Sequence, residues 1–140
     1  MPYITQVDST LWALITRLQG QELQTPHTPS NARFQVDAVG ADNLTITTGA
    51  QASSLTISRG AFQQTLDYLA ANGHFGVSNA VPVASNKDPA LAGPVCLAAR
   101  LQPNGNPGRM VITYILPILE HCQAVGIQRA TTPTTTWLLP

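Results

Sequence analysis

SLTISRGAFQQTLDYLAANG, residues 54–73, contains the change of hydrophobic period that decides the fold. In its first part, Leu55 and Ile57 alternate with Ser and Thr, which is the pattern of a strand with one buried face. In its second part, Phe62 and Leu66 are spaced as neighbours on one face of a helix. The stretch therefore predicts a strand that continues directly into a helix.

Polar residues and glycine mark the ends of two predicted helices. Ser58 can accept hydrogen bonds from the first free amides of the helix that follows it, and Asn72-Gly73 favours a left-handed stop at its end. An earlier helix is predicted over residues 8–18, where apolar side chains recur at helical spacing and Asp8 or Ser9 can act as the cap. Each helix is expected to bury one face.

Three segments with alternating apolar side chains lie upstream of the helix that Ser58 begins. They are residues 33–39, 44–48 and 54–58. In the first of them, Phe34, Val36 and Ala38 are expected on one face. The connections are of hairpin length, so a three-stranded antiparallel meander is the expected topology, and residues 22–25 are a candidate for a further strand.

Downstream of Gly73, the pattern predicts two more helices and a hairpin. The predicted elements are helices over residues 95–101 and 109–123 and strands over residues 125–129 and 135–139. Residues 74–94 are irregular and contain several prolines, so they form either a joint between two subdomains or a long ordered loop. Pro117 predicts a kink or a break in the second of these helices, because proline has no amide hydrogen to donate.

Charge is scarce in this chain. Of its 140 residues 10% are charged, against roughly 25% in usual soluble domains, and seven basic side chains balance seven acidic ones. With 44% hydrophobic residues the chain is not expected to be disordered, and it has no bulk basic field to attract nucleic acid. The longest apolar stretch, residues 110–119, is too short to span a bilayer. The N-terminus lacks the pattern of a secretory signal, so we expect no membrane contact and a cytoplasmic location.

Candidate catalytic and metal-binding side chains are dispersed along the sequence. Cys96 and Cys122 fall in predicted buried helices, which favours free thiols over a disulfide. His121 and Cys122 are adjacent, and adjacent helical residues project about 100° apart, which disfavours a nucleophile and base pair. His27, His74 and His121 have no metal-ligand spacing. We therefore expect no catalytic residue, no metal site and no cofactor.

The predicted elements together make an α+β protein. Residues 1–57 are expected to form an N-terminal helix plus a small antiparallel sheet. Residues 58–140 are expected to form three helices followed by a β-hairpin. The two parts are either separate subdomains or one continuous domain.

The order of elements after Ser58 resembles the winged helix-turn-helix arrangement. SRGAFQQTLDYLAANG, PVCLAARL, RMVITYILPILEHCQ and VGIQRATTPTTTWLL carry the resemblance. It implies DNA binding, with the third helix in the major groove and the hairpin, or wing, near phosphate or the minor groove. The nucleic-acid-binding residues expected on this basis are Arg109 and Thr113 on the third helix, Arg129, Thr131 and Thr132 on the wing, and Arg100 and Lys87 elsewhere.

Two features of the sequence depart from that arrangement. The third helix is apolar on most sides, so it is either the central core helix or it completes its burial against another subunit. The positive charges are scattered, which predicts weak, salt-sensitive binding because affinity for DNA scales with the number of phosphates neutralised. Six of the seven basic residues are arginine, which suits bidentate recognition of phosphate, guanine or carboxylate.

Two classes of function follow as expectations. The first is a small non-enzymatic binding protein that contacts DNA or a nucleoprotein complex through its winged-helix-like half. The alternative is a protein–protein adaptor or inhibitor that docks on a larger complex, with a homodimer also open, and the near-neutral charge favours this class. By analogy with other small proteins of this kind, the setting would be a defence system or mobile element of a prokaryote or phage.

Overall fold

The strand and the helix on either side of Ser58 form as predicted. The computed structural model describes residues 3–26, 32–48, 53–129 and 133–140. In it, β4 (Ser53–Ser58) runs directly into α2 (Arg59–Ala71). The Ser58 side chain accepts a hydrogen bond from the Ala61 amide at 3.1 Å. This bond satisfies one of the amides that the first turn of a helix leaves without a backbone partner.

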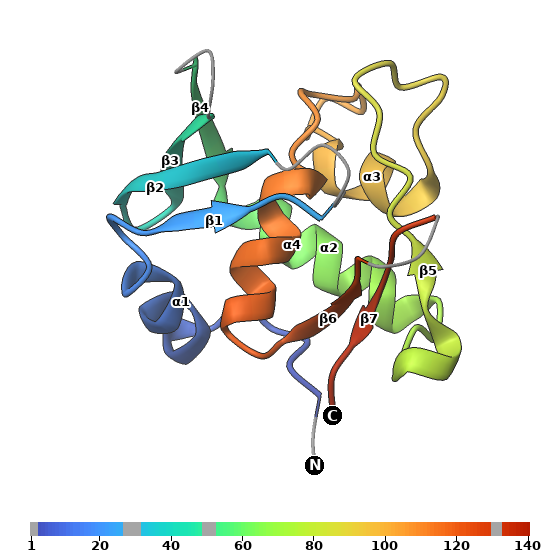
Figure 1. The fold of residues 1–140 in the computed structure, drawn as a ribbon. Coiled ribbons are helices and arrows are strands. Elements are labelled where there is room, and N and C mark those ends of the chain that lie inside the picture. The colour runs from blue at the N-terminus through green and yellow to red at the C-terminus, as the bar shows by residue number, and fades with distance from the viewer. Residues whose placement is uncertain (1–2, 27–31, 49–52, 130–132) are drawn as a thin grey trace.

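A four-stranded antiparallel sheet forms the first half of the fold (Figure 1). Its strands, in spatial order, are β1 (Glu22–Gln24), β2 (Arg33–Val39), β3 (Asn43–Thr48) and β4. The predicted meander is confirmed, and the candidate strand before it is the fourth member. α1 (Ser9–Thr16) precedes the sheet and is capped by Asp8, which accepts from the Leu11 amide at 2.9 Å.

A bulge in β2 changes one of the predicted core positions. Phe34 and Val36 are buried as expected, but the register between β2 and β3 shifts between Val36 and Ala38. The extra residue turns Ala38 to solvent, and Val39 packs against the core instead. The strict alternation expected from the sequence therefore fails at one step.

The most apolar helix is the central one, which decides between the two alternatives left open by the sequence. α4 (Ile112–His121) contacts α2, α3 (Pro94–Arg100), β1 and β6 (Val125–Gln128) (Figure 1). The helix is continuous through Pro117, so the predicted break does not occur. It is also shorter than predicted, and Arg109 lies in the segment ahead of it.

The irregular segment after Gly73 is ordered against the C-terminal hairpin. β6 pairs with β7 (Thr135–Leu138) as predicted, and β5 (Val81–Pro82) adds to the other side of β7. The short 3-10 helix η2 (Val77–Asn79) lies between α2 and β5. The amide of Leu138 donates to the carbonyl of His74 at 2.8 Å, and the amide of Gly76 donates to the carbonyl of Leu138 at 2.9 Å. Backbone hydrogen bonds therefore join residues 74–83 of this segment to the hairpin.

The buried side chains of both halves form one continuous hydrophobic cluster. The predicted α+β class, with a helix, an antiparallel sheet, further helices and a C-terminal hairpin, is confirmed. The order of α2, α3, α4 and the β6–β7 hairpin is loosely compatible with a winged-helix arrangement. None of the helices in the described ranges combines the length and apolarity that a membrane span requires.

Gly126 allows the hairpin to pack against its own tryptophan. Gly126 and Trp137 face each other across the β6–β7 ladder. A Cβ atom on Gly126 would lie 2.5 Å from two carbon atoms of the Trp137 ring. The ring therefore covers the glycine backbone, and no other residue fits there without displacing it.

We predict that Gly126→Ala lowers the free energy of unfolding by about 1–3 kcal/mol, because the added methyl group forces the Trp137 ring out of place. Urea denaturation measures the change. Gly60→Ala is the matched control, since its Cβ would meet nothing nearer than 3.8 Å in α2, and it should gain about 0.5–1 kcal/mol from helix propensity. Equal stability of the two variants would contradict this account of the hairpin.

Candidate binding site

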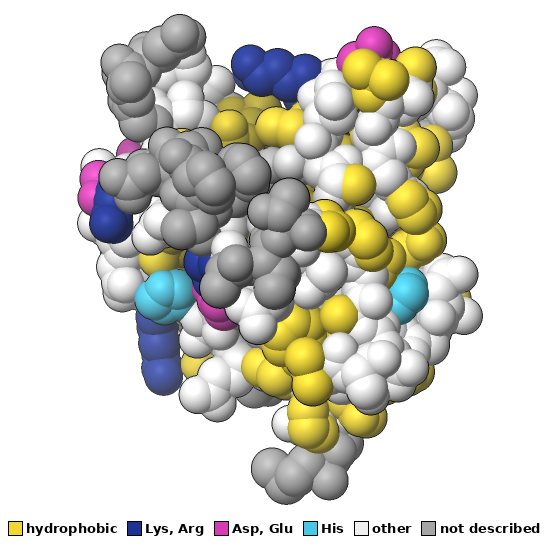
Figure 2. All heavy atoms as spheres, turned by 45° about the vertical axis from the view of Figure 1, so that its right-hand side comes forward, with side chains coloured by type: hydrophobic (Ala, Val, Ile, Leu, Met, Phe, Trp, Pro, Cys, Tyr) yellow, Lys and Arg dark blue, Asp and Glu magenta, His cyan; other side chains and the backbone are white. Residues whose placement is uncertain are grey.

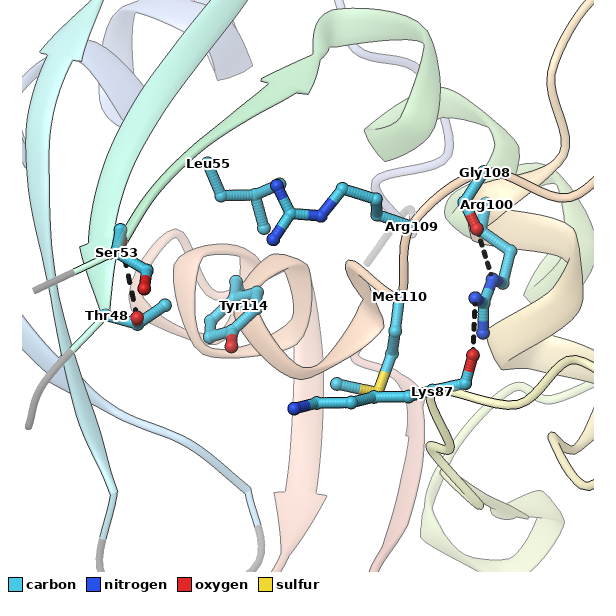
Figure 3. A pocket seen from close by; sticks show the side chains of 9 residues that line it. All are labelled: Thr48, Ser53, Leu55, Lys87, Arg100, Gly108, Arg109, Met110 and Tyr114. Atoms are coloured by element: carbon cyan, nitrogen blue, oxygen red, sulfur yellow. Dashed lines mark hydrogen bonds between the residues drawn. The ribbon is translucent and has the colours of Figure 1, made fainter. Parts of the chain in front are cut away.

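Basic side chains are few and separated on the face drawn in Figure 2. Lys87 and Arg109 converge from separate loops on one pocket of about 490 Å³ (Figure 3). The pocket lies where the β3–β4 hairpin approaches the start of α4, and its lining includes Thr48, Ser53, Leu55, Met110 and Tyr114. Of the seven candidate residues, the structure brings Lys87, Arg100 and Arg109 together here.

The charges of Lys87 and Arg109 are not balanced locally. Both side chains are exposed, and neither has a hydrogen bond or ion pair with any residue that the structure describes. None of the described residues that line the pocket carries a carboxylate. The arrangement can therefore accept an anionic group without first breaking an internal ion pair.

Tyr114 places a hydroxyl group in the same pocket. Burial raises the pKa of Tyr114, and the nearby Arg109 guanidinium opposes that rise only in part. The phenol therefore keeps its proton at neutral pH and can donate a hydrogen bond to an anion. Its ring is fixed edge-on against Phe34, with the ring centroids 5.2 Å apart.

Arg100 positions the two exposed cations and is itself buried. Its guanidinium donates to the carbonyl oxygen of Gly108 at 2.8 Å and of Lys87 at 3.0 Å (Figure 3). It also donates to the carbonyl oxygen of Asn86 at 2.6 Å. The hydrogen bond to its carbonyl holds the backbone of Lys87 in place. Arg109 directly follows Gly108, whose carbonyl is held in the same way. Arg100 was expected to contact nucleic acid. A buried guanidinium with three carbonyl partners has few hydrogen-bond donors left for a ligand, so the role of Arg100 in this pocket is structural.

Arg129, the expected wing residue that the structure describes, does not line this pocket. Arg129 donates to a carboxylate oxygen of Glu120 at 2.6 Å and to the Gln24 carbonyl at 3.3 Å, so it ties the hairpin to α4 and β1. Thr131 and Thr132 lie outside the described residues.

Thr113, expected on an exposed face of the third helix, is half-buried on α4. Its hydroxyl contacts the Met110 sulfur atom at 3.8 Å. Thr113 lines a separate cavity of about 310 Å³ together with residues of the β5 and β7 ends, among them Val83 and Thr134. It is therefore not part of the Lys87–Arg109 pocket.

A second pocket continues the first along the edge of the sheet. It measures about 470 Å³ and lies between Leu55–Ser58 of β4, the first turns of α2 and the chain from 99 to 111. The two pockets share Leu55, Arg100, Gly108 and Arg109. Together they form a groove along β4 from Ser53 to Ser58, which we call the β4 groove. Sequence reasoning missed it, although the absence of charge and proline in SSLTIS was a signal of an unprotected strand edge.

The two cysteines are free and buried, as expected. Burial raises the pKa of Cys122 to about 11, so this thiol is protonated at neutral pH and is a poor nucleophile. Within the described ranges, no three side chains of His, Cys, Asp or Glu lie close enough to hold a metal ion.

We predict that Arg100→Ala lowers the free energy of unfolding by about 2–4 kcal/mol, because it removes the charged donor that holds the carbonyl groups of two loops together. Chemical denaturation measures the loss. Arg109→Ala is the control from the same pocket and should change stability by less than about 0.5 kcal/mol. A small effect of Arg100→Ala would show that Arg100 does not hold the two loops.

Stability should also depend on pH through Cys122. The reference thiol ionises near pH 9.0, whereas the folded one keeps its proton to about pH 11. The raised pKa therefore contributes stability that is complete below pH 9 and is lost as pH rises toward 11. Urea unfolding at pH values below 9 and near 11 should show a larger loss for the native chain than for Cys122→Ala. Equal losses would mean that Cys122 is not shielded from water.

Comparison of the chain with protein-family models, with curated proteins and with solved structures finds no match. A functional proposal therefore depends on the geometry of this chain. Its two relevant features are the Lys87–Arg109 pocket and the open edge of β4 beside it.

Proposed function

We propose that this protein is a non-enzymatic cytoplasmic binding protein, an adaptor or inhibitor that docks on another protein through the β4 groove. One observation carries the proposal: β4 is an edge strand with no charged residue, and it borders a groove that contains two cations without a partner among the described residues. Native proteins usually protect such edges, because an open edge is a template for pairing with another chain. An edge left open beside a groove is therefore suited to a protein partner.

The position of α4 favours a protein partner over duplex DNA. A helix that reads the major groove needs an exposed face. α4, which is described throughout, exposes only His121. In this proposal the winged-helix-like half is a scaffold for protein contact, which is a frequent reuse of such folds.

DNA or a nucleoprotein complex is the second candidate, and the Lys87–Arg109 pocket is the observation that favours it. Two cations neutralise about two phosphates, so the logarithm of affinity should fall against the logarithm of salt concentration with a slope of about −2. Four of the other arginines, Arg33, Arg59, Arg100 and Arg129, already have internal partners. Arg59, for example, lies 5.1 Å from the centre of the Trp12 ring and donates to the Val7 carbonyl at 2.9 Å.

Selection from a displayed library of random peptides tests the proposed function. We expect selected peptides, added to ¹⁵N-labelled protein, to shift the amide signals of β4 and of Arg109 in NMR spectra, because the β4 groove is the docking surface. Random duplex DNA is titrated in parallel over a range of salt concentrations, and it should bind weakly or not at all.

Two results would count against a protein-docking function. One is a selection that yields no binder, or only binders that leave the β4 signals unchanged. The other is binding of duplex DNA with a salt slope near −2 that Lys87→Ala and Arg109→Ala each reduce by about one. The second result would establish the nucleic-acid candidate instead.

A further inference from the structure

We infer that the β4 groove accepts an extended acidic segment of a partner protein, which adds to the first sheet as a fifth strand and places its carboxylates against Arg109 and Lys87. This inference rests on the proposed function and names the partner's chemistry and its mode of binding. Its elements are a free strand edge, a face that points into the pocket and an unbalanced positive charge.

The register of the sheet shows which backbone groups of β4 have no partner among the described residues. The Arg59 amide donates to the Asp42 carbonyl at 2.7 Å, and these two residues face each other in the register that continues the β3–β4 ladder. Hydrogen-bonded and non-bonded pairs alternate along an antiparallel ladder. Ile57 and Leu55 therefore bond to β3, whereas the N–H and C=O groups of Thr56 point away from it. The same alternation leaves the backbone of β4 open at every second residue.

The two edges of the first sheet differ in how they are protected. β1 is three residues long, it contacts α4, and its Gln24 carbonyl accepts from Arg129. β4 is six residues long and carries no charge, proline or glycine. Short length and coverage are the usual protections of an edge. Only the β1 edge has them, so β4 is the edge suited to pairing.

Side-chain direction links the strand edge to the two cations. Leu55 is a buried residue of β4 that lines both pockets, and Arg109 lines the same two pockets from the opposite wall (Figure 3). In an added strand, the residue opposite Leu55 would point to the same side of the sheet as Leu55. An acidic side chain at that position would meet Arg109, and one two residues away would approach Lys87 or the Tyr114 hydroxyl.

Charge complementarity selects an acidic partner over a second copy of this chain. A second copy that paired through its own β4 would present SSLTIS, which contains no carboxylate. It would also bring a second Lys87 and Arg109 toward the first pair without any negative charge between them. An acidic strand from a different protein would pair with the β4 backbone and would also bring carboxylates to Lys87 and Arg109.

Two end-capped peptides test the inference. One alternates Val and Glu, and the other alternates Val and Gln. Each is about eight residues long, which is longer than the usual strand. Binding is followed by NMR on the full chain at low salt. We expect the Glu peptide to bind about tenfold more tightly, because each of two exposed ion pairs should contribute about threefold in affinity. Arg109→Gln should reduce that preference to about threefold.

A matched pair of variants tests the strand pairing. Thr56→Pro removes the free amide hydrogen at the edge without touching the ladder to β3, whereas Thr56→Ala keeps that hydrogen. Affinity for the Glu peptide should fall about tenfold in the proline variant and stay within about twofold in the alanine variant. Thermal unfolding of both variants confirms that each is folded at the temperature of the titration.

The outcomes separate this inference from the proposed function. Equal binding of the Glu and Gln peptides, with sensitivity to Thr56→Pro retained, overturns the acidic partner and leaves protein docking in place. Equal effects of Thr56→Pro and Thr56→Ala overturn the added strand. Self-association that Thr56→Pro abolishes makes the occupant a second copy. Failure of both peptides to bind, together with DNA binding at the pocket, overturns the inference and the proposed function together.

Discussion

The burial of α4 on most of its sides is the constraint on which the rest of the structure depends. Its apolar side chains must all be removed from water, and one sheet or one helix pair cannot cover them. The first sheet, the C-terminal hairpin, α2 and α3 therefore surround it, and the buried residues join in one cluster. The same constraint leaves α4 without the exposed face that a helix in the major groove needs.

One buried guanidinium connects this core to the surface that is available for binding. Arg100 closes the loop between α3 and α4 by donating to Gly108, and it fixes the loop that carries Lys87. Burying a charge is costly unless it is fully hydrogen-bonded, and its three carbonyl partners meet that condition. Arg109 and Lys87 can consequently remain exposed and line one pocket, although they come from different loops. Because the net charge of the chain is zero, the positions of Lys87 and Arg109 say more about the candidate site than the number of charges does.

The same residues show how far the sequence could predict the candidate site. The winged-helix resemblance places Arg109 at the start of the third helix and Arg129 on the wing, and it gives Arg100 no particular position. The structure gives Arg100 and Arg129 each a set of internal partners that sequence spacing does not reveal. The bulge in β2 is a similar case, because an extra residue in a strand depends on how the neighbouring strand pairs with it.

The sequence by itself determined the elements: the change of period at Ser58, the capped helices, the meander and the final hairpin all follow from local spacing and hydrogen-bonding preferences. Only the tertiary structure decided that α4 is central, that residues 81–82 form a third strand on the hairpin, and that β4 is an open edge beside Lys87 and Arg109. Local patterns reflect interactions within a few residues. Coverage of an apolar helix and convergence of two loops depend on contacts between segments far apart in the chain, which no local pattern encodes.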